Sequence, residues 1–126
     1  MLTIHGIRTC DSCKKAIRWA QEKGIDHSFH DWRNDGLDED QLDMWLLDLG
    51  WEQVLNKRST SWRELPKEVQ NAVDADMART LLIGNPTLIK RPLFTLDGSD
   101  EVVLGFTKDS QSALNRMLAG DEEGAL

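Results

Sequence analysis

The sequence predicts an α/β fold with a mixed β-sheet, and the order of its hydrophobic patterns carries that prediction. Residues 2–6 alternate polar and apolar side chains, as β-strands do, and residues 26–32 are expected to form a second strand. A helix-like pattern lies between them. Residues 36–84 then show mostly helical patterns. Two further β-like runs flank a turn sequence at residues 97–99, and a last helical pattern follows.

The first strand and the first helix are joined by a short loop that holds both cysteines. Leu2 and Ile4 alternate with polar neighbours in the strand. The helix is expected to end at Lys23 and Gly24, because a cation followed by a glycine is typical of a helix C-terminus. Since a strand, a helix and a second strand in this order normally form a parallel pair, we expect these two strands to pair in parallel.

The block at residues 36–84 is expected to be a helical insertion outside the sheet. Asp38 favours a helix N-cap with Gln41 three residues later, and Gly50 closes that helix. A further cap is expected at Ser61, ahead of a short helix. Additional helices are predicted over residues 66–72 and 74–82.

A β-hairpin and a final helix are expected to complete the fold. Residues 93–96 and 101–104 favour strands, and Thr107 or Asp109 can cap the helix that follows. Residues 119–126 are small and polar, so we expect a flexible tail there.

Length and composition narrow the class of protein. Residues 1–118 are expected to form a single domain, because a chain of 126 residues suffices for a hydrophobic core. The formal net charge of −7 argues against a nucleic-acid binder, which carries a basic face. No apolar run of about 18 residues predicts a membrane span, and the first residues lack the pattern of a signal peptide. We therefore expect a monomer in the cytoplasm, a reducing compartment that fits the two cysteines.

The two cysteines, Cys10 and Cys13, form a C-x-x-C motif at the expected start of the first helix. Unpaired backbone N–H groups point outward at a helix N-terminus and stabilise negative charge. Such a position, with cations nearby, lowers a cysteine pKa from about 8.5 to roughly 3.5–7.5. Arg8, Lys14 and Lys15 are the cations that are near in sequence. Since the thiolate is the attacking form of cysteine, the motif favours a redox or nucleophilic role for Cys10.

Three other interpretations of the cysteines stay open. They are a structural disulfide, a pair of inert thiols, and half of a zinc site that histidines complete. His27 and His30 are three residues apart in an expected strand, so their side chains point to opposite faces and do not easily share a metal. We therefore favour the redox interpretation and expect no metal.

The predicted order of elements resembles a thioredoxin-like α/β sandwich. Such chains place a cysteine at the end of the first strand and oppose it with a proline in a cis peptide bond before the hairpin. Arg91 and Pro92 precede the first hairpin strand and match that position. We therefore predict that the Arg91–Pro92 bond is cis, a form taken by about 5–6% of X–Pro bonds in folded proteins.

Four segments in order resemble the ArsC/Spx family of arsenate reductases and Spx regulators, with a pattern closest to its YffB-like branch. These segments are residues 6–16, 56–59, 85–92 and 103–106. The resemblance runs from residue 2 to residue 118 and implies a thioredoxin-like fold with a helical insertion. It also implies that Cys10 is the nucleophile, that Arg91 binds anions and that Pro92 is the cis proline.

Several positions depart from the arsenate reductase pattern, His-x-x-x-Cys-x-x-x-Arg. Gly6 stands at the histidine and Lys14 at the arginine, and a lysine lacks the bidentate fork that suits an oxyanion. Asn56 occupies the place of a second reductase arginine, and Phe106 and Thr107 stand near that of a third. Arsenate reduction is therefore expected to be weak or absent.

Two functions follow from the resemblance. The favoured one is a glutathione-linked thiol reductase, in which Cys10 attacks the substrate and glutathione or Cys13 resolves the adduct. Cations around the thiolate are then expected to bind glutathione carboxylates or a small oxyanion. The alternative is an Spx-like regulator that binds RNA polymerase, with the cysteine pair as a redox switch. The expected binding residues are Lys14, Arg58, Arg91 and Pro92.

Overall fold

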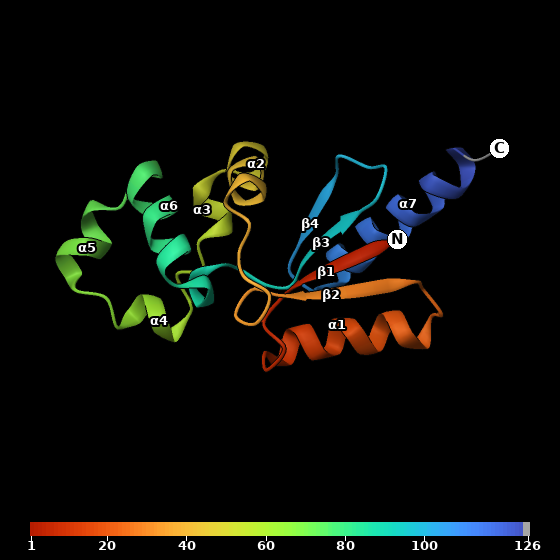
Figure 1. Ribbon diagram of the computed structural model, residues 1–126, viewed down its shortest axis with the longest axis horizontal. Coiled ribbons are helices and arrows are strands. Elements are labelled where there is room, and N and C mark those ends of the chain that lie inside the picture. Colours follow the sequence, from red (N-terminus) through yellow and green to blue (C-terminus); the bar gives the residue numbers. More distant parts are fainter. Residues whose placement is uncertain (125–126) are drawn as a thin grey trace. The chain divides into compact units, whose positions relative to one another are not determined.

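Four strands form a mixed sheet in the first of the two compact units of the chain (Figure 1). The structure, a computed structural model, describes residues 1–124. Its first unit comprises Met1–Asp35 and Arg91–Leu126, and its second comprises Gly36–Lys90. β1 pairs in parallel with β2 and antiparallel with β3, and β3 pairs antiparallel with β4, which confirms the predicted mixed sheet. The strands, in the order β2-β1-β3-β4, are β2 (His27–Asp31), β1 (Leu2–Gly6), β3 (Leu93–Leu96) and β4 (Val102–Leu104).

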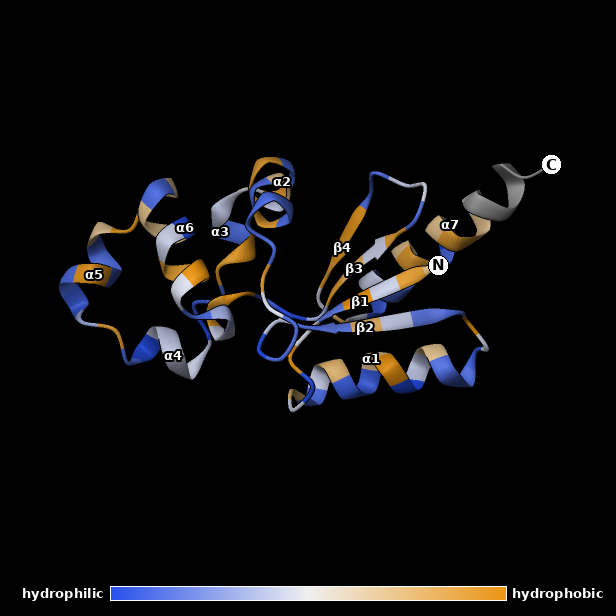
Figure 2. Cartoon of the chain, in the orientation of Figure 1, coloured by the Kyte–Doolittle hydropathy of each residue, from blue (hydrophilic) through white to orange (hydrophobic). Residues whose placement is uncertain are grey.

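Two helices, α1 (Asp11–Glu22) and α7 (Lys108–Gly124), pack on one face of this sheet. The register places Leu2 opposite Leu96 and Ile4 opposite Phe94, so the side chains of each pair share a face. Figure 2 shows hydrophobic and hydrophilic residues together on the turns of α1, as a helix with one buried side requires. Burial of each large apolar side chain contributes roughly 1.5–3 kcal/mol to stability. The core residues are Leu2, Ile4, Ala16, Ala20, Phe94, Leu96, Val103, Leu114 and Met117.

The last helix begins where a reciprocal pair of hydroxyl groups caps it. The Thr107 Oγ1 atom accepts from the Ser110 backbone N–H at 3.1 Å, and the Ser110 Oγ atom accepts from the Thr107 N–H at 3.2 Å. Thr107 is therefore the cap, of the two residues that the sequence offered. The helix runs to Gly124 and includes most of residues 119–126, whose expected flexibility stays a prediction; residues 125–126 lie outside the described residues. Nowhere in residues 1–124 does a helix have the length and apolarity that crossing a membrane demands.

The opposite face of the sheet is polar along β1 and its neighbours. Thr3 Oγ1 lies 3.3 Å from Ser28 Oγ across the parallel pair, and His5 Nε2 lies 2.9 Å from Thr95 Oγ1 across the antiparallel pair. The His5 and His30 rings are also neighbours, with centroids 5.7 Å apart. His5 is only 3% exposed, and its burial together with the adjacent His30 lowers its pKa from 6.5 to about 4.

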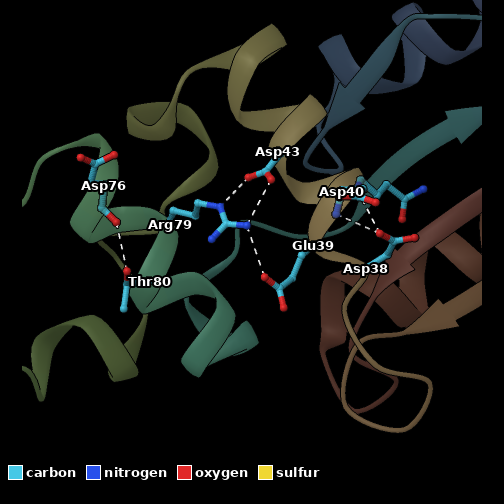
Figure 3. Close-up of polar contacts among 8 residues, drawn as sticks. Asp38, Glu39, Asp40, Asp43, Asp76, Arg79 and Thr80 are labelled. Carbon is cyan, nitrogen blue, oxygen red and sulfur yellow. Dashed lines mark hydrogen bonds and ion pairs between the residues drawn. The ribbon is translucent and has the colours of Figure 1, made fainter.

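The second unit contains helices and no strand of the sheet, as predicted for the insertion. Asp38 caps its first helix as expected, because Asp38 Oδ1 accepts from the backbone N–H groups of Asp40 and Gln41 (Figure 3). The cap expected at Ser61 is wrong: Ser59 has the extended backbone of a cap residue and accepts from the Trp62 N–H at 3.1 Å. Its helices are α2 (Glu39–Leu49), α3 (Trp51–Val54), α4 (Thr60–Arg63), α5 (Lys67–Ala72) and α6 (Ala75–Gly84), followed by the 3₁₀ helix η1 (Pro86–Leu88).

An arginine joins α2 to α6 on the surface of the second unit. Arg79 Nε lies 2.6 Å from Asp43 Oδ1, and Arg79 Nη2 lies 3.1 Å from Asp43 Oδ2 and 3.3 Å from Glu39 Oε1 (Figure 3). The bond to Asp43 is a bidentate fork, the geometry in which an arginine binds a carboxylate most specifically. Elsewhere in this unit, the backbone N–H of Asn56 donates to the Leu88 carbonyl at 2.8 Å, which joins the loop after α3 to η1.

Candidate functional site

Cys10 occupies the N-cap of α1, at the end of the loop that follows β1. Its backbone is extended, with φ −76° and ψ 128°, and its carbonyl accepts the first helical hydrogen bond, from Lys14 N–H at 3.0 Å. A turn holds it there, because Cys10 N–H donates to the Ile7 carbonyl at 2.9 Å. The predicted position at a helix N-terminus is confirmed.

The surroundings of Cys10 favour its thiolate. Partial burial of the sulfur opposes ionisation, but four other effects outweigh it and lower the Cys10 pKa below its usual value. The larger two are hydrogen bonds that Cys13 donates, from its backbone N–H and from its thiol. The positive charge of Arg91 and the Ser12 backbone N–H add to them.

Cys13 has the opposite character. It is fully buried in the third position of α1, and burial raises the pKa of its thiol to about 12. The nearby Cys10 charge and the hydrogen bond to Cys10 also raise it, whereas the Ile7 backbone N–H and Arg91 lower it. The two cysteines therefore divide into one thiol that ionises easily and one that keeps its proton and donates it to the first.

The Arg91–Pro92 peptide bond is cis, as predicted, and precedes β3 directly. The Pro92 carbonyl accepts from Gly105 N–H at 2.7 Å, so the loop before β3 is fixed to the loop after β4. The positive charge of Arg91 favours the thiolate form of both Cys10 and Cys13. Of the predicted binding residues, Arg91 is thus the one whose electrostatic effect reaches the nucleophile.

Asp31 anchors the cysteine-bearing loop, a role that the sequence pattern did not reveal. It ends β2 opposite Gly6, is 3% exposed, and its Oδ2 atom accepts from the Arg8 backbone N–H at 3.2 Å. Its Oδ1 atom accepts from Arg33 N–H at 2.9 Å and from Asn34 N–H at 3.4 Å. Although burial opposes ionisation, these hydrogen bonds lower the Asp31 pKa. This contact could not be predicted from the sequence pattern, because only the pairing of β1 with β2 brings Arg8 and Asp31 together.

The other predicted residues lie in more open surroundings. Lys14 is exposed on α1, one turn after Cys10. Arg58 is exposed in the second unit, on a loop where Asn56 Oδ1 accepts from the Arg58 N–H at 3.0 Å. Its expected position beside Cys10 stays a prediction. No group of three or more potential metal ligands occurs in the described part of the chain.

A neighbouring lysine on this loop lies close to two tryptophans. Lys57 Nζ lies 5.7 Å from the ring centroid of Trp51 and 5.6 Å from that of Trp62. These are cation–π distances, and such contacts orient a loop at an exposed site. The adjacent cations Lys57 and Arg58 therefore differ in surroundings, since the lysine is held over aromatic rings.

Comparison with known proteins gives a consistent family. The model of the ArsC family matches residues 5–114. An uncharacterized protein of Haemophilus influenzae is 42% identical over 113 residues, which cover 90% of this chain and 97% of that protein. The global transcriptional regulator Spx of Streptococcus pyogenes is 28% identical over 112 residues, which cover 86% of this chain and 81% of the regulator.

Solved structures share the fold. The YffB protein superposes with a TM-score of 0.80 at 34% identity, covering 90% of this chain and 97% of its own. An arsenate reductase (ArsC) related protein from Brucella melitensis gives a TM-score of 0.74 at 41% identity, covering 89% and 92%. The predicted thioredoxin-like fold, with its mixed four-stranded sheet and helices, is thereby confirmed.

Proposed function

Because this chain belongs to the ArsC family, we propose that it is a thiol-dependent reductase that uses glutathione. The observation that carries the proposal is the setting of Cys10, an N-cap cysteine whose thiolate is stabilised by backbone N–H groups and by Arg91. A thiolate that forms readily and is partly exposed is the chemical requirement for attack on a disulfide.

The proposed reaction takes two exchanges. The Cys10 thiolate attacks the glutathione sulfur of a mixed disulfide between substrate and glutathione, forming a Cys10–glutathione disulfide and releasing the substrate thiolate. The thiolate of a second glutathione then attacks the glutathione sulfur on Cys10, which releases oxidised glutathione and restores the Cys10 thiolate. Overall, the sulfur of the second glutathione is oxidised from thiolate to disulfide and the substrate sulfur is reduced from disulfide to thiolate, which takes one proton from water.

Arg91 is the residue that we expect to contact an anionic group of the substrate, since its charge reaches Cys10. Lys14 supplies a charge one turn along α1, but without the fork of an arginine it holds a planar oxyanion less firmly. Pro92 fixes the chain that leads from the cis bond into β3. With Gly6 in place of the family histidine, we expect little arsenate turnover.

Treatment with oxidised glutathione followed by mass spectrometry tests the proposal. In the Cys13→Ser variant we expect a glutathione adduct on Cys10, formed faster than on a free cysteine at pH 7, and no adduct on Cys10→Ser. Reduced glutathione should release it. If Cys10 in the Cys13→Ser variant reacts no faster than free cysteine, the activated nucleophile is absent and the reductase proposal fails.

A second function, an Spx-like regulator, has one observation in its favour. The buried Cys13 thiol lies against Cys10, as a pair that switches between dithiol and disulfide requires, and an Spx regulator is among the relatives. An activity assay separates the reductase from the regulator. If the protein is a glutathione-linked reductase, its Cys13→Ser variant keeps its activity on a glutathione mixed disulfide. If it is a regulator, it shows no such activity and instead binds RNA polymerase differently in its oxidised and reduced forms.

A further inference from the structure

Gly6, the last residue of β1, lies directly against the sulfur of Cys13. A Cβ atom added at residue 6 would overlap Cys13 Sγ, at a separation that side chains do not adopt. The same Cβ would lie 3.7 Å from Cys13 Cβ and 3.6 Å from Arg91 Cβ, which are ordinary contacts. The Cys13 sulfur is therefore the one neighbour within 4 Å that needs residue 6 to be glycine.

The space left by Gly6 holds Cys13 in contact with the nucleophile. The Cys13 sulfur is fully buried, the Ile7 backbone N–H hydrogen-bonds to it, and it donates in turn to Cys10. Residue 6 and the Cys13 thiol thus compete for one volume at the base of the cysteine loop. A sulfur pushed out of this volume leaves its donor, Ile7, and its contact with Cys10.

We infer that Gly6 selects the two-thiol route of this site, because its missing side chain lets the Cys13 thiol reach Cys10. In this chain, a side chain at position 6 displaces the Cys13 sulfur and so leaves Cys10 to work with an external thiol. This inference rests on the proposed reactivity of Cys10. It adds a second fate for the Cys10–glutathione adduct, in which Cys13 takes the place of the second glutathione and resolves it.

The route itself balances with oxidised glutathione as the oxidant. The Cys10 thiolate attacks one glutathione sulfur and releases glutathione thiolate. Cys13 then loses its proton, and its thiolate attacks the Cys10 sulfur, which forms the Cys10–Cys13 disulfide and releases the second glutathione thiolate. One oxidised glutathione is consumed and two reduced glutathiones form. The first step removes the Cys10 charge, one of the causes that hold the Cys13 pKa high, so the adduct itself eases the second step.

Four full-length proteins test the inference: the wild type, Gly6→Ala, Cys13→Ala and the double variant. Under reducing conditions, Gly6→Ala should lower Tm by several degrees when Cys13 is present, since the alanine Cβ displaces the sulfur. In the Cys13→Ala background it should not lower Tm, because only ordinary contacts remain. Gly84→Ala is the matched control, since an added Cβ there meets nothing within 4 Å and the backbone does not need positive φ.

Oxidised glutathione supplies the second readout. The wild type should accumulate the Cys10–Cys13 disulfide, whereas Gly6→Ala should accumulate the Cys10–glutathione adduct, as Cys13→Ala does. An equal Tm loss in both backgrounds, or a disulfide yield in Gly6→Ala equal to that of the wild type, would overturn the inference. A Cys10 that is unreactive in all four proteins would instead overturn the proposed function, and the selection of a route with it.

Discussion

Asp31 Oδ2 accepts a hydrogen bond from the backbone N–H of Arg8, so the end of β2 holds the loop that carries the nucleophile. The two residues are adjacent because β1 and β2 pair in parallel with Gly6 opposite Asp31. The carboxylate is buried and serves further backbone donors in the turn that follows β2. Asp31 therefore fixes the position of the cysteine loop relative to the sheet.

Asp31→Ala should lower the free energy of unfolding by about 1–3 kcal/mol, because it removes a buried acceptor and leaves part-buried backbone N–H groups without it. Urea titration at pH 7 measures this loss, and Asp31→Asn, which keeps one acceptor oxygen, should recover part of it. The folded-state pKa of Asp31 lies below the unfolded value of 3.8, so its contribution is present above pH 3.8 and is lost as the pH falls through the folded pKa. A wild type and Asp31→Ala of equal stability at pH 7 would contradict this role.

The buried His5 should make the stability of the protein depend on pH. Its pKa is about 4 when folded and 6.5 when unfolded, so between these values the unfolded chain binds more protons. Stability should therefore fall as the pH drops from 6.5 to 4, by on the order of 3 kcal/mol from this residue. Denaturant titrations of the wild type and His5→Gln at several pH values isolate that slope. An NMR titration in which His5 of the folded protein ionises near pH 6.5 would contradict this prediction, because His5 would then contribute nothing to the pH dependence of stability.

Arg91, whose charge lowers the Cys10 pKa, and Lys14, one turn along α1, should act differently on Cys10. Arg91→Gln should raise the apparent pKa of Cys10 and slow its alkylation at pH 7 several-fold, because the thiolate loses a positive charge. Lys14→Gln is the comparison, since Lys14 is exposed and solvent screens its charge. Alkylation rates from pH 4 to pH 10, measured in the Cys13→Ser background, report Cys10 alone. Equal effects of the two substitutions would mean that Arg91 has no special position.

The Arg79–Asp43 fork should contribute a small stability that salt weakens. Arg79→Gln should lower Tm slightly at low ionic strength and less at high ionic strength, because both side chains are largely exposed. A double-mutant cycle with Asp43→Asn measures the interaction itself. If the two substitutions are additive in low salt, the bidentate contact does not stabilise the pair of helices.

The elements of this fold follow from local sequence, and so does the position of the nucleophile. Alternation in residues 2–6 and the Lys23–Gly24 ending are signals that a few neighbouring residues carry, and the structure keeps both. The Ser61 cap was predicted from Glu64 three residues later, but Ser59 is the cap and the Ser61 hydroxyl instead contacts that of Thr87 at 2.5 Å. Local rules rank such alternatives poorly when a distant residue decides.

The candidate site shows the same limit. Cys10 was predicted from the C-x-x-C motif, and Arg91 from the resemblance to the ArsC/Spx family. Asp31 and the fit of Gly6 to Cys13 depend on strand pairing and on side-chain volume, which a sequence pattern does not contain. Single residues that act by filling or leaving space are therefore the part of such a site that only three-dimensional structure supplies.

The central strand β1 precedes both of its neighbours along the chain, and the sheet around it is completed only when the later neighbour has been made. On the ribosome β1 emerges well before β3, yet Leu2 pairs with Leu96. All of Gly36–Lys90 must leave the ribosome before β3 can pair with β1. That segment is made of helices with short-range contacts, so it can fold before the sheet is complete. Until then β1 has a free edge and the cysteine loop lacks Arg91, so the nascent chain carries its thiols before it has the charge that activates them.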